Sequence, residues 1–215
     1  DSLLSGTGGA GNSFNLTAST DDLAGTSGND TFDASLSQNP MAGGVSNSLS
    51  SADRVDGGEG NDALHAQIVP EYFGTAGDQL MDIQPTTTSV ETVTLEARDG
   101  LIGDSLPDGT AITLDAKDMT DIVNIGSRQS DGDLIIENLT TLTEGGEARN
   151  TEALTISMDH TDNFNSDGDA SDLTVYFDED YLLSDQSSTV SQANYWLLDE
   201  ESEDYVNAPL LNVER

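Results

Sequence analysis

Two nine-residue segments with matching glycine and aspartate positions constrain the fold of this chain more than any other feature. They run Gly25–Asp33 and Gly57–His65. Both fit the pattern G-G-x-G-x-D-x-U-x, in which U is a large apolar residue, except that Thr26 replaces the second glycine of the first copy. This nonapeptide is a calcium-binding repeat of β-helices. Its glycines permit tight turns, its aspartate supplies a carboxylate, and its apolar residue, Phe32 or Leu64, is expected in the core.

The two copies are predicted to share one calcium ion. In such repeats the ion lies between successive turns, so that each turn supplies half of a coordination shell of oxygen atoms. The 23 residues between the copies are expected to loop out and let the turns stack. The predicted ligands are the carboxylates of Asp30 and Asp62, with backbone carbonyls from Gly25, Ser27, Gly57 and Glu59. Two independent surface turns are the alternative.

An acidic segment in the C-terminal half is a second candidate calcium site. It contains N-x-N-x-D-G-D, which is similar to the start of an EF-hand loop. An EF-hand has Glu at position 12, where this chain has Thr174, and strand patterns rather than helices flank the segment. We therefore predict a calcium loop in a β-hairpin, with a solvated acidic turn as the alternative. Its candidate ligands are Asn163, Asn165, Asp167, Asp169 and Asp172.

The net charge restricts the possible partners. The chain has 41 Asp and Glu residues against 6 Lys and Arg residues, which gives a formal net charge of −35. Such a chain repels nucleic acids and anionic membranes and attracts divalent cations. A salt-adapted acidic surface and a disordered chain are alternative interpretations, although 34% hydrophobic residues and clear strand patterns favour a folded protein. Without cysteine, stability is expected from core burial and bound metal.

Alternating apolar residues predict an all-β fold. Period-two patterns occur around Leu95, Leu114, Ile125, Ile156 and Val175. Together with the glycine turns, they favour a short parallel β-solenoid or β-roll-like stack, with a β-sandwich as the alternative and few short helices. One helical turn is expected at 114–120 and another at 179–184. No apolar run approaches the length of a membrane span, so no membrane insertion is expected.

The chain is expected to divide into a linker, residues 1–15, and one calcium-stabilised β domain, residues 16–215. The domain has a glycine-turn part, 16–68, and a β part, 69–215. A polar loop, 35–51, is expected to protrude from the first part. The strand-like end of the chain fits the first portion of a split domain.

Signals for catalysis are weak. The two histidines, His65 and His160, show no zinc-binding spacing. A structural role is favoured for His65 and a loop position for His160. The aromatic pair Tyr195-Trp196 fits core packing better than a ligand-binding platform. No catalytic residue is predicted.

The chain resembles modules of large bacterial repeats-in-toxin (RTX) adhesins and related haemolysin-type surface proteins. The resemblance lies in Thr26–Phe32, Asp56–Asp62 and Val90–Val93, in this order, and extends over about residues 14–160. It implies type I secretion, folding outside the cell when calcium is met, and a place in a long fibre beside other modules of the same chain. The nonapeptides are isolated rather than tandem here, so a long regular roll is not expected.

Three functions are weighed on this basis. The favoured one is a calcium-stabilised, non-catalytic scaffold module in extracellular, cell-surface adhesion. The second is a direct calcium-dependent receptor for a surface glycan or peptide. The third is an extracellular hydrolase or polysaccharide lyase, which would need a basic residue near calcium-binding acids, such as Arg98, Arg128 or Arg149.

Overall fold

The fold is rich in parallel β-strands. The computed structural model describes residues 9–38, 44–70, 82–98, 111–140, 154–159, 171–178, 194–198 and 205–213, the last two segments as backbone only. These residues form strands and turns and contain no helix, and therefore none that could span a membrane. The prediction of an all-β chain agrees with this strand-rich architecture.

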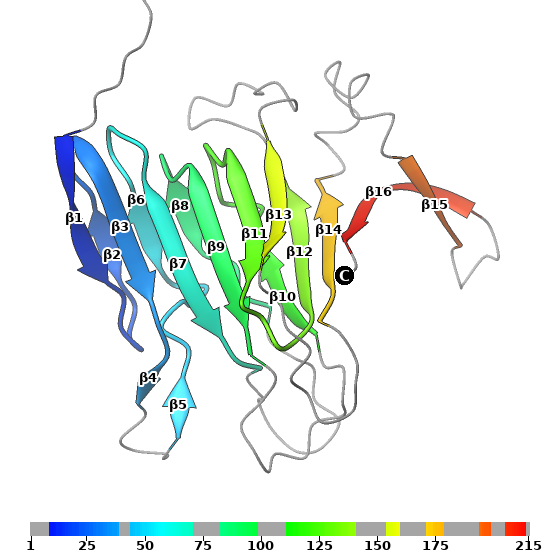
Figure 1. The fold of residues 1–215 in the computed structure, drawn as a ribbon, viewed down its shortest axis with the longest axis horizontal. Helices are drawn as coiled ribbons and strands as arrows, with labels where there is room; N and C mark the ends of the chain where they lie inside the picture. The colour runs from blue at the N-terminus through cyan, green and yellow to red at the C-terminus, as the bar shows by residue number, and fades with distance from the viewer. Residues whose placement is uncertain are drawn as a thin grey trace, which may run out of the picture.

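The largest sheet has six parallel strands in the order β1-β3-β7-β9-β11-β13. Each strand pairs with the one that follows it in this order, so the chain returns to the sheet one position further along each time (Figure 1). The strands are β1 (Gly9–Asn15), β3 (Gly28–Ala34), β7 (Ala63–Ile68), β9 (Thr92–Ala97), β11 (Asn124–Arg128) and β13 (Thr155–Asp159).

Behind the six-stranded sheet in the view of Figure 1 lie a three-stranded sheet and the first strands of a five-stranded sheet, whose last two strands extend past β13. The three-stranded sheet is parallel and consists of β2 (Asp22–Ala24), β6 (Arg54–Asp56) and β8 (Thr86–Thr88). The five-stranded sheet has the order β10-β12-β14-β16-β15; β10, β12 and β14 are parallel, and β16 runs antiparallel to both β14 and β15. Its strands are β10 (Ile112–Asp115), β12 (Leu134–Leu139), β14 (Leu173–Phe177), β16 (Tyr205–Val213) and β15 (Asn194–Leu198).

Strand pairing places apolar side chains in columns between the sheets. Phe14, Phe32, Leu64, Val93 and Ile125 are partners in successive strands of the six-stranded sheet. The rings of the first two stack with centroids 5.1 Å apart, and the last three are almost completely buried. Since side chains alternate between the faces of a strand, the predicted period-two patterns mark the buried face, while polar residues occupy the outer face.

Three expectations differ from the structure. Gly9–Asn15, expected in the linker, forms strand β1 and pairs with β3. The segment 35–51 contains the antiparallel pair β4 (Ser37–Gln38) and β5 (Val45–Ser46), and Asn47, Ser48 and Leu49 are buried rather than protruding.

The helical turn expected at 114–120 is also wrong. Strand β10 covers Ile112–Asp115, and a tight turn follows in which the Met119 N–H donates to the Ala116 carbonyl. The second expected turn, 179–184, lies outside the described residues, as does His160, while Tyr195-Trp196 belongs to β15.

Candidate functional site

The two glycine turns stack directly on each other. Strands β3 and β7 pair so that Phe32 lies beside Leu64. Equivalent residues of the two nonapeptides are therefore neighbours, as predicted. The Gly25 N–H donates to the Asp56 carbonyl at 2.7 Å, and the Glu59 N–H donates to the Thr26 carbonyl at 3.1 Å. The segment between the two copies thus allows the turns to stack, as predicted. Part of this segment forms strands and buried structure and does not loop out.

Close backbone approach explains the glycines at the start of each turn. A Cβ on Gly25 would lie 2.0 Å from the Gly57 carbonyl oxygen, and a Cβ on Gly57 would lie 1.8 Å from the Ser89 carbonyl oxygen. Real Cβ atoms do not approach backbone oxygens so closely. Gly58, with φ of 89°, also needs the conformational freedom of glycine. The turns therefore require glycine for stacking itself, whether or not a metal binds.

Acidic side chains form a column along the stacked turns, here called the carboxylate column: Asp30, Asp62 and Glu91. Each carboxylate accepts a backbone N–H from the preceding strand. The Asn12 N–H donates to Asp30 Oδ1 at 2.5 Å, the Asp30 N–H to Asp62 Oδ1 at 2.6 Å, and the Asp62 N–H to Glu91 Oε2 at 2.7 Å. Hydrogen bonds to ionised acceptors are stronger than neutral ones, so the column ties four strands together at one edge.

The Asp30 carboxylate is fully engaged within the protein. Besides the Asn12 N–H, it accepts the Thr26 N–H at 2.5 Å and the Thr26 hydroxyl, which lies 3.0 Å from both carboxylate oxygens. The backbone N–H groups of Asn12 and then Thr26 hold the pKa of Asp30 below its ordinary value, because they stabilise the ionised form. Thr26, the residue that departs from the glycine pattern, thus donates hydrogen bonds to the carboxylate of its own turn.

The Asp62 carboxylate differs because one of its oxygens is buried without a partner. Asp62 is 1% exposed, and among the described residues nothing donates a hydrogen bond to Oδ2. Burial raises the pKa of Asp62 above its ordinary value, and the charges of Asp30 and Asp56 raise it further, against the opposing effect of the Asp30 N–H. Gly58 stands where the first turn has Thr26, so no side-chain hydroxyl is available there.

The two turns differ in whether their aspartate has an oxygen to spare. At the second turn, Asp62 Oδ2 has no hydrogen-bond donor among the described residues, and a carboxylate oxygen is a ligand that calcium accepts. At the first turn, the donors of Thr26 and Asn12 already occupy Asp30. The described residues contain no group of three or more His, Cys, Asp or Glu side chains placed to hold a metal ion.

The remaining predicted ligands are placed as follows. Ser27 is exposed on the first turn, and Glu59 is exposed on the second. Asp172 precedes β14, and its N–H donates to Asp133 Oδ1 at 2.9 Å. The other candidates of the acidic loop lie outside the described residues: Asn163, Asn165, Asp167 and Asp169.

Sequence reasoning missed two members of this site, Asn12 and Glu91. Glu91 had a recognisable signal, because it precedes the buried Val93 by two residues, as Asp62 precedes Leu64. A second pair of stacked acids was also missed: the Asp21 N–H donates to Asp53 Oδ1 at 2.8 Å, and Asp53 is 1% exposed.

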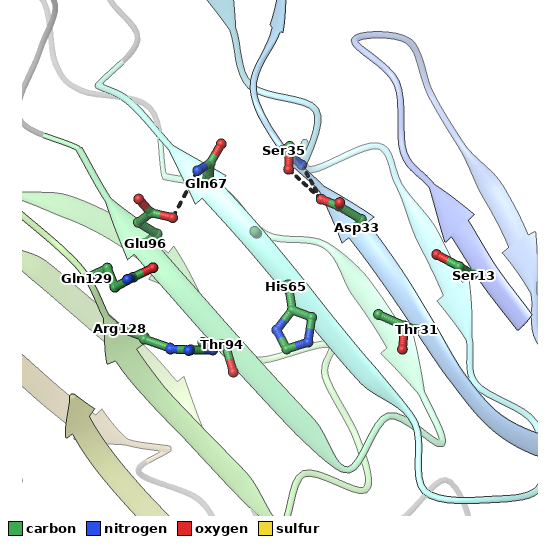
Figure 2. A pocket seen from close by; sticks show the side chains of 11 residues that line it. Ser13, Thr31, Asp33, Ser35, His65, Gln67, Thr94, Glu96, Arg128 and Gln129 are labelled. Atoms are coloured by element: carbon green, nitrogen blue, oxygen red, sulfur yellow. Dashed lines mark hydrogen bonds between the residues drawn. The ribbon is translucent and has the colours of Figure 1, made fainter. Parts of the chain in front are cut away.

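A shallow hollow of about 230 Å³ lies on the outer face of the six-stranded sheet, and Thr31, Asp33 and His65 at the ends of the two nonapeptides are among its lining residues (Figure 2). Its described lining comes from β1, β3, β7, β9 and β11 and from the residues that follow β3 and β11, and most of these residues carry a polar group on the side chain. Asp33, His65 and Thr94 are direct partners across three neighbouring strands. Arg128 and Gln129 close one side. We call this feature the face hollow.

Some side chains of the face hollow are bound to each other. Gln67 donates to Glu96 Oε2 at 2.9 Å, and Ser35 donates to Asp33 Oδ1 from both its N–H and its hydroxyl. Glu96 also forms an ion pair with Arg98. The acids of the hollow are thus partly neutralised within the sheet.

No family model, no curated protein and no solved structure matches this chain. The class of protein that the fold and site define is therefore a strand-rich protein with stacked parallel sheets and a column of carboxylates at one edge.

Proposed function

We propose that this chain is a calcium-stabilised, non-catalytic extracellular module of a bacterial RTX adhesin, a short parallel β-solenoid that serves as a structural scaffold at the cell surface. Its partners are neighbouring modules of the same long chain. The observation that carries the proposal is the stacked pair of glycine turns, in which the buried Asp62 Oδ2 has no donor among the described residues.

Charge supports the coupling of folding to a cation. The fold stacks Asp30, Asp62 and Glu91 at one edge of a chain with a formal net charge of −35. Such self-repulsion opposes the compact state. A divalent cation at the second turn would neutralise two charges and give Asp62 Oδ2 a partner, and this binding requires the stacked arrangement.

Extracellular calcium concentrations suit such a site. Extracellular calcium modules have dissociation constants of about 10⁻⁴ to 10⁻³ M. A ligand that binds only the folded state stabilises it by mass action, by about 1.4 kcal/mol at a concentration ten times the dissociation constant. For a chain of this size, that corresponds to a rise in melting temperature of roughly 3–6 °C.

Thermal melts and calorimetric calcium titrations of Asp62→Asn and Asp30→Asn test the proposal. Calcium is expected to raise the melting temperature of the wild type and of Asp30→Asn, whereas Asp62→Asn loses this rise and one bound ion. Asp22→Asn is the control, because Asp22 is exposed on β2, outside the column.

Two results would contradict the proposal. One is a wild-type melt that does not change between calcium and a chelator such as EGTA. The other is a calcium-dependent rise that is equal in the wild type and in Asp62→Asn, which would place the ion elsewhere.

A further inference from the structure

We propose that the face hollow binds a neutral, hydroxyl-rich glycan, with His65, Thr94 and Arg128 as the principal hydrogen-bonding residues. This binding site goes beyond the scaffold role, and the carboxylate column takes no part in it.

The first argument is a set of polar groups with unused hydrogen-bonding capacity. No described residue forms a hydrogen bond with the His65 imidazole, the Thr94 hydroxyl or the Gln129 carboxamide, although all three line the same hollow. Figure 2 shows the Arg128 side chain extending from β11 towards Thr94 on β9, with the His65 ring on the next strand. Solvent-facing donors that converge on one hollow can bind a ligand without giving up internal bonds.

Arg128 is only weakly held in its present position. Within the part of the chain that the structure describes, its ion pair is with Asp159, at 4.0 Å, and the side chains are 55% and 56% exposed. Exposed pairs of this kind contribute about 0–1 kcal/mol. The guanidinium can therefore turn to a ligand at little cost.

Gln129 adds a backbone feature at the rim of the hollow. Its φ is 55°, in the left-handed region that residues other than glycine rarely adopt. Its N–H donates to the Asp159 carbonyl at 2.9 Å, which fixes this conformation. Residues held in this way cluster at ligand-binding sites, and here the conformation places an unengaged carboxamide beside Arg128.

The mixture of donors and acceptors favours a ligand with hydroxyl groups. Across the sheet from the free donors lie Asp33 and Glu96, whose carboxylates accept hydrogen bonds. A sugar hydroxyl both donates and accepts, so it can bridge His65 or Arg128 to one of these acids. Among the described lining residues, Ala66 is the one with an apolar side chain.

Net charge decides between neutral and acidic glycans. The chain carries a formal net charge of −35, which repels a polyanion over distances up to about the 8 Å screening length at physiological salt. Inside the hollow, Arg128 is opposed by Asp33 and Glu96, so the local charge is not positive enough to reverse this repulsion. A neutral hexose polymer meets no such barrier.

The lining also sets the expected strength of binding. Among the described residues it contains no Phe, Tyr or Trp, so stacking of a large aromatic ring on a sugar face does not contribute. Affinity rests on hydrogen bonds to an open surface, and we expect dissociation constants of about 1 mM for a short oligosaccharide.

Proton NMR of the histidine rings gives a direct test, because the chain has two histidines, His65 and His160. A His160→Ala variant assigns the two ring signals. The full chain, at one fixed calcium concentration, is titrated with maltohexaose, mannohexaose and hexagalacturonate. The His65 signal is expected to shift saturably with at least one of the neutral hexasaccharides.

Two substitutions in the hollow and one outside it locate the binding. Arg128→Ala and Thr94→Val are each expected to weaken binding about tenfold, as for loss of a hydrogen bond to a ligand. Arg54→Ala, on the exposed face of β6 in another sheet, is the matched control and leaves binding unchanged. Circular dichroism confirms that each variant keeps its strand content.

Three results would overturn the proposal: no shift of the His65 signal with either neutral hexasaccharide, tighter binding of hexagalacturonate than of both, or equal binding by wild type and Arg128→Ala. If calcium does not raise the melting temperature but the His65 signal still shifts with a neutral hexasaccharide, only the calcium-dependent scaffold is refuted. If calcium raises the melting temperature as expected but the His65 signal does not shift, only the glycan site is refuted.

Discussion

The backbone N–H of Asp30 donates a 2.6 Å hydrogen bond to Oδ1 of Asp62, and these two aspartates have pKa values shifted in opposite directions. They occupy equivalent positions in two copies of one motif. Asp30 is satisfied by Asn12 and Thr26, whereas Asp62 is buried with one oxygen unpartnered among the described residues. The residue after the first glycine contributes to this difference, because the Thr26 N–H and hydroxyl donate to Asp30, whereas the Gly58 N–H donates to Asp56 Oδ1 at 3.1 Å.

Replacing Thr26 by glycine is therefore expected to convert the first turn into a copy of the second. In Thr26→Gly, Asp30 loses the hydroxyl that lies 3.0 Å from both of its oxygens. We expect one additional calcium ion per chain by calorimetric titration, together with a lower melting temperature in the absence of calcium. Thr26→Ser keeps the hydroxyl and should behave as wild type. An unchanged stoichiometry in Thr26→Gly would show that Thr26 does not block an ion.

Substitution of Gly57 is expected to disrupt the stacking of the turns. The new methyl group of Gly57→Ala would lie 1.8 Å from the Ser89 carbonyl oxygen and 2.9 Å from Asp62 Cβ. A clash with backbone cannot be relieved by a side-chain rotation, so we expect a loss of more than about 3 kcal/mol in the free energy of unfolding. Urea denaturation measures this loss.

Gly9→Ala is the matched control for that experiment, because a Cβ at Gly9 would meet nothing within 4 Å. Its stability should remain within about 0.5 kcal/mol of wild type. Similar losses in both variants would contradict the close approach at Gly57.

The calcium-free protein is expected to lose stability as the pH rises above the unfolded-state pKa values of two of its acids, Asp62 and Glu137. Burial raises the pKa of Asp62 and of Glu137, and for Glu137 the charges of Asp82 and Asp115 add to the effect. An acid with a raised folded-state pKa binds its proton more tightly when folded, so stability falls as pH rises above the unfolded values of 3.8 and 4.5. The lowered pKa of Asp30 acts in the opposite way, and its contribution is lost as the pH falls below about 3.8.

Urea midpoints at pH 5 and pH 7, after calcium is removed on a chelating resin, check this prediction. Glu137→Gln should reduce the difference between the two midpoints, since it removes one of the two acids. A midpoint that increases from pH 5 to pH 7 would contradict the raised pKa values.

Asn47 is expected to be essential for anchoring the segment that follows β5. Its carboxamide donates to the Val69 carbonyl at 2.9 Å and accepts the Val69 N–H at 2.8 Å, and both residues are buried. Asn47→Ala leaves two buried backbone groups without partners, at a cost of about 2–4 kcal/mol. Asn61→Ala, at an exposed position, is the control in the same urea experiment. Equal stability of the two variants would contradict this role.

The buried face of each strand could be predicted from the sequence, but the pairing of strands could not. Alternation around Leu95 and Val175 correctly marks buried residues, because burial on one face of a strand follows a local pattern. The sequence contains the motif E-x-φ-T-φ, with φ an apolar residue, at 91–95 and again at 152–156, and this repeat aligns Val93 with Leu154. The structure instead pairs Val93 with Ile125, and Ile125 with Ile156. A shift of two residues keeps every side chain on the same face, so the pattern cannot reveal it.

The stacking of the two glycine turns could be predicted, whereas the role of Thr26 could not. The turns have matching glycine and apolar positions, which define how they superimpose. In the sequence, Thr26 is only a residue that departs from the motif. Its hydrogen bonds to Asp30 become apparent only in the three-dimensional structure. The polar composition of residues 35–51 similarly predicted an exposed loop, and it gave no sign that Asn47 is buried.

Neighbouring strands are joined by unequal lengths of chain without loss of register. Paired positions are 32 residues apart for Asp30 and Asp62, 29 for Gln67 and Glu96, and 39 for Asp133 and Asp172. Register thus depends on the strands, and the connections between them are free to vary in length. A change in the length of a connection should therefore leave intact the pairing of the strands on either side of it.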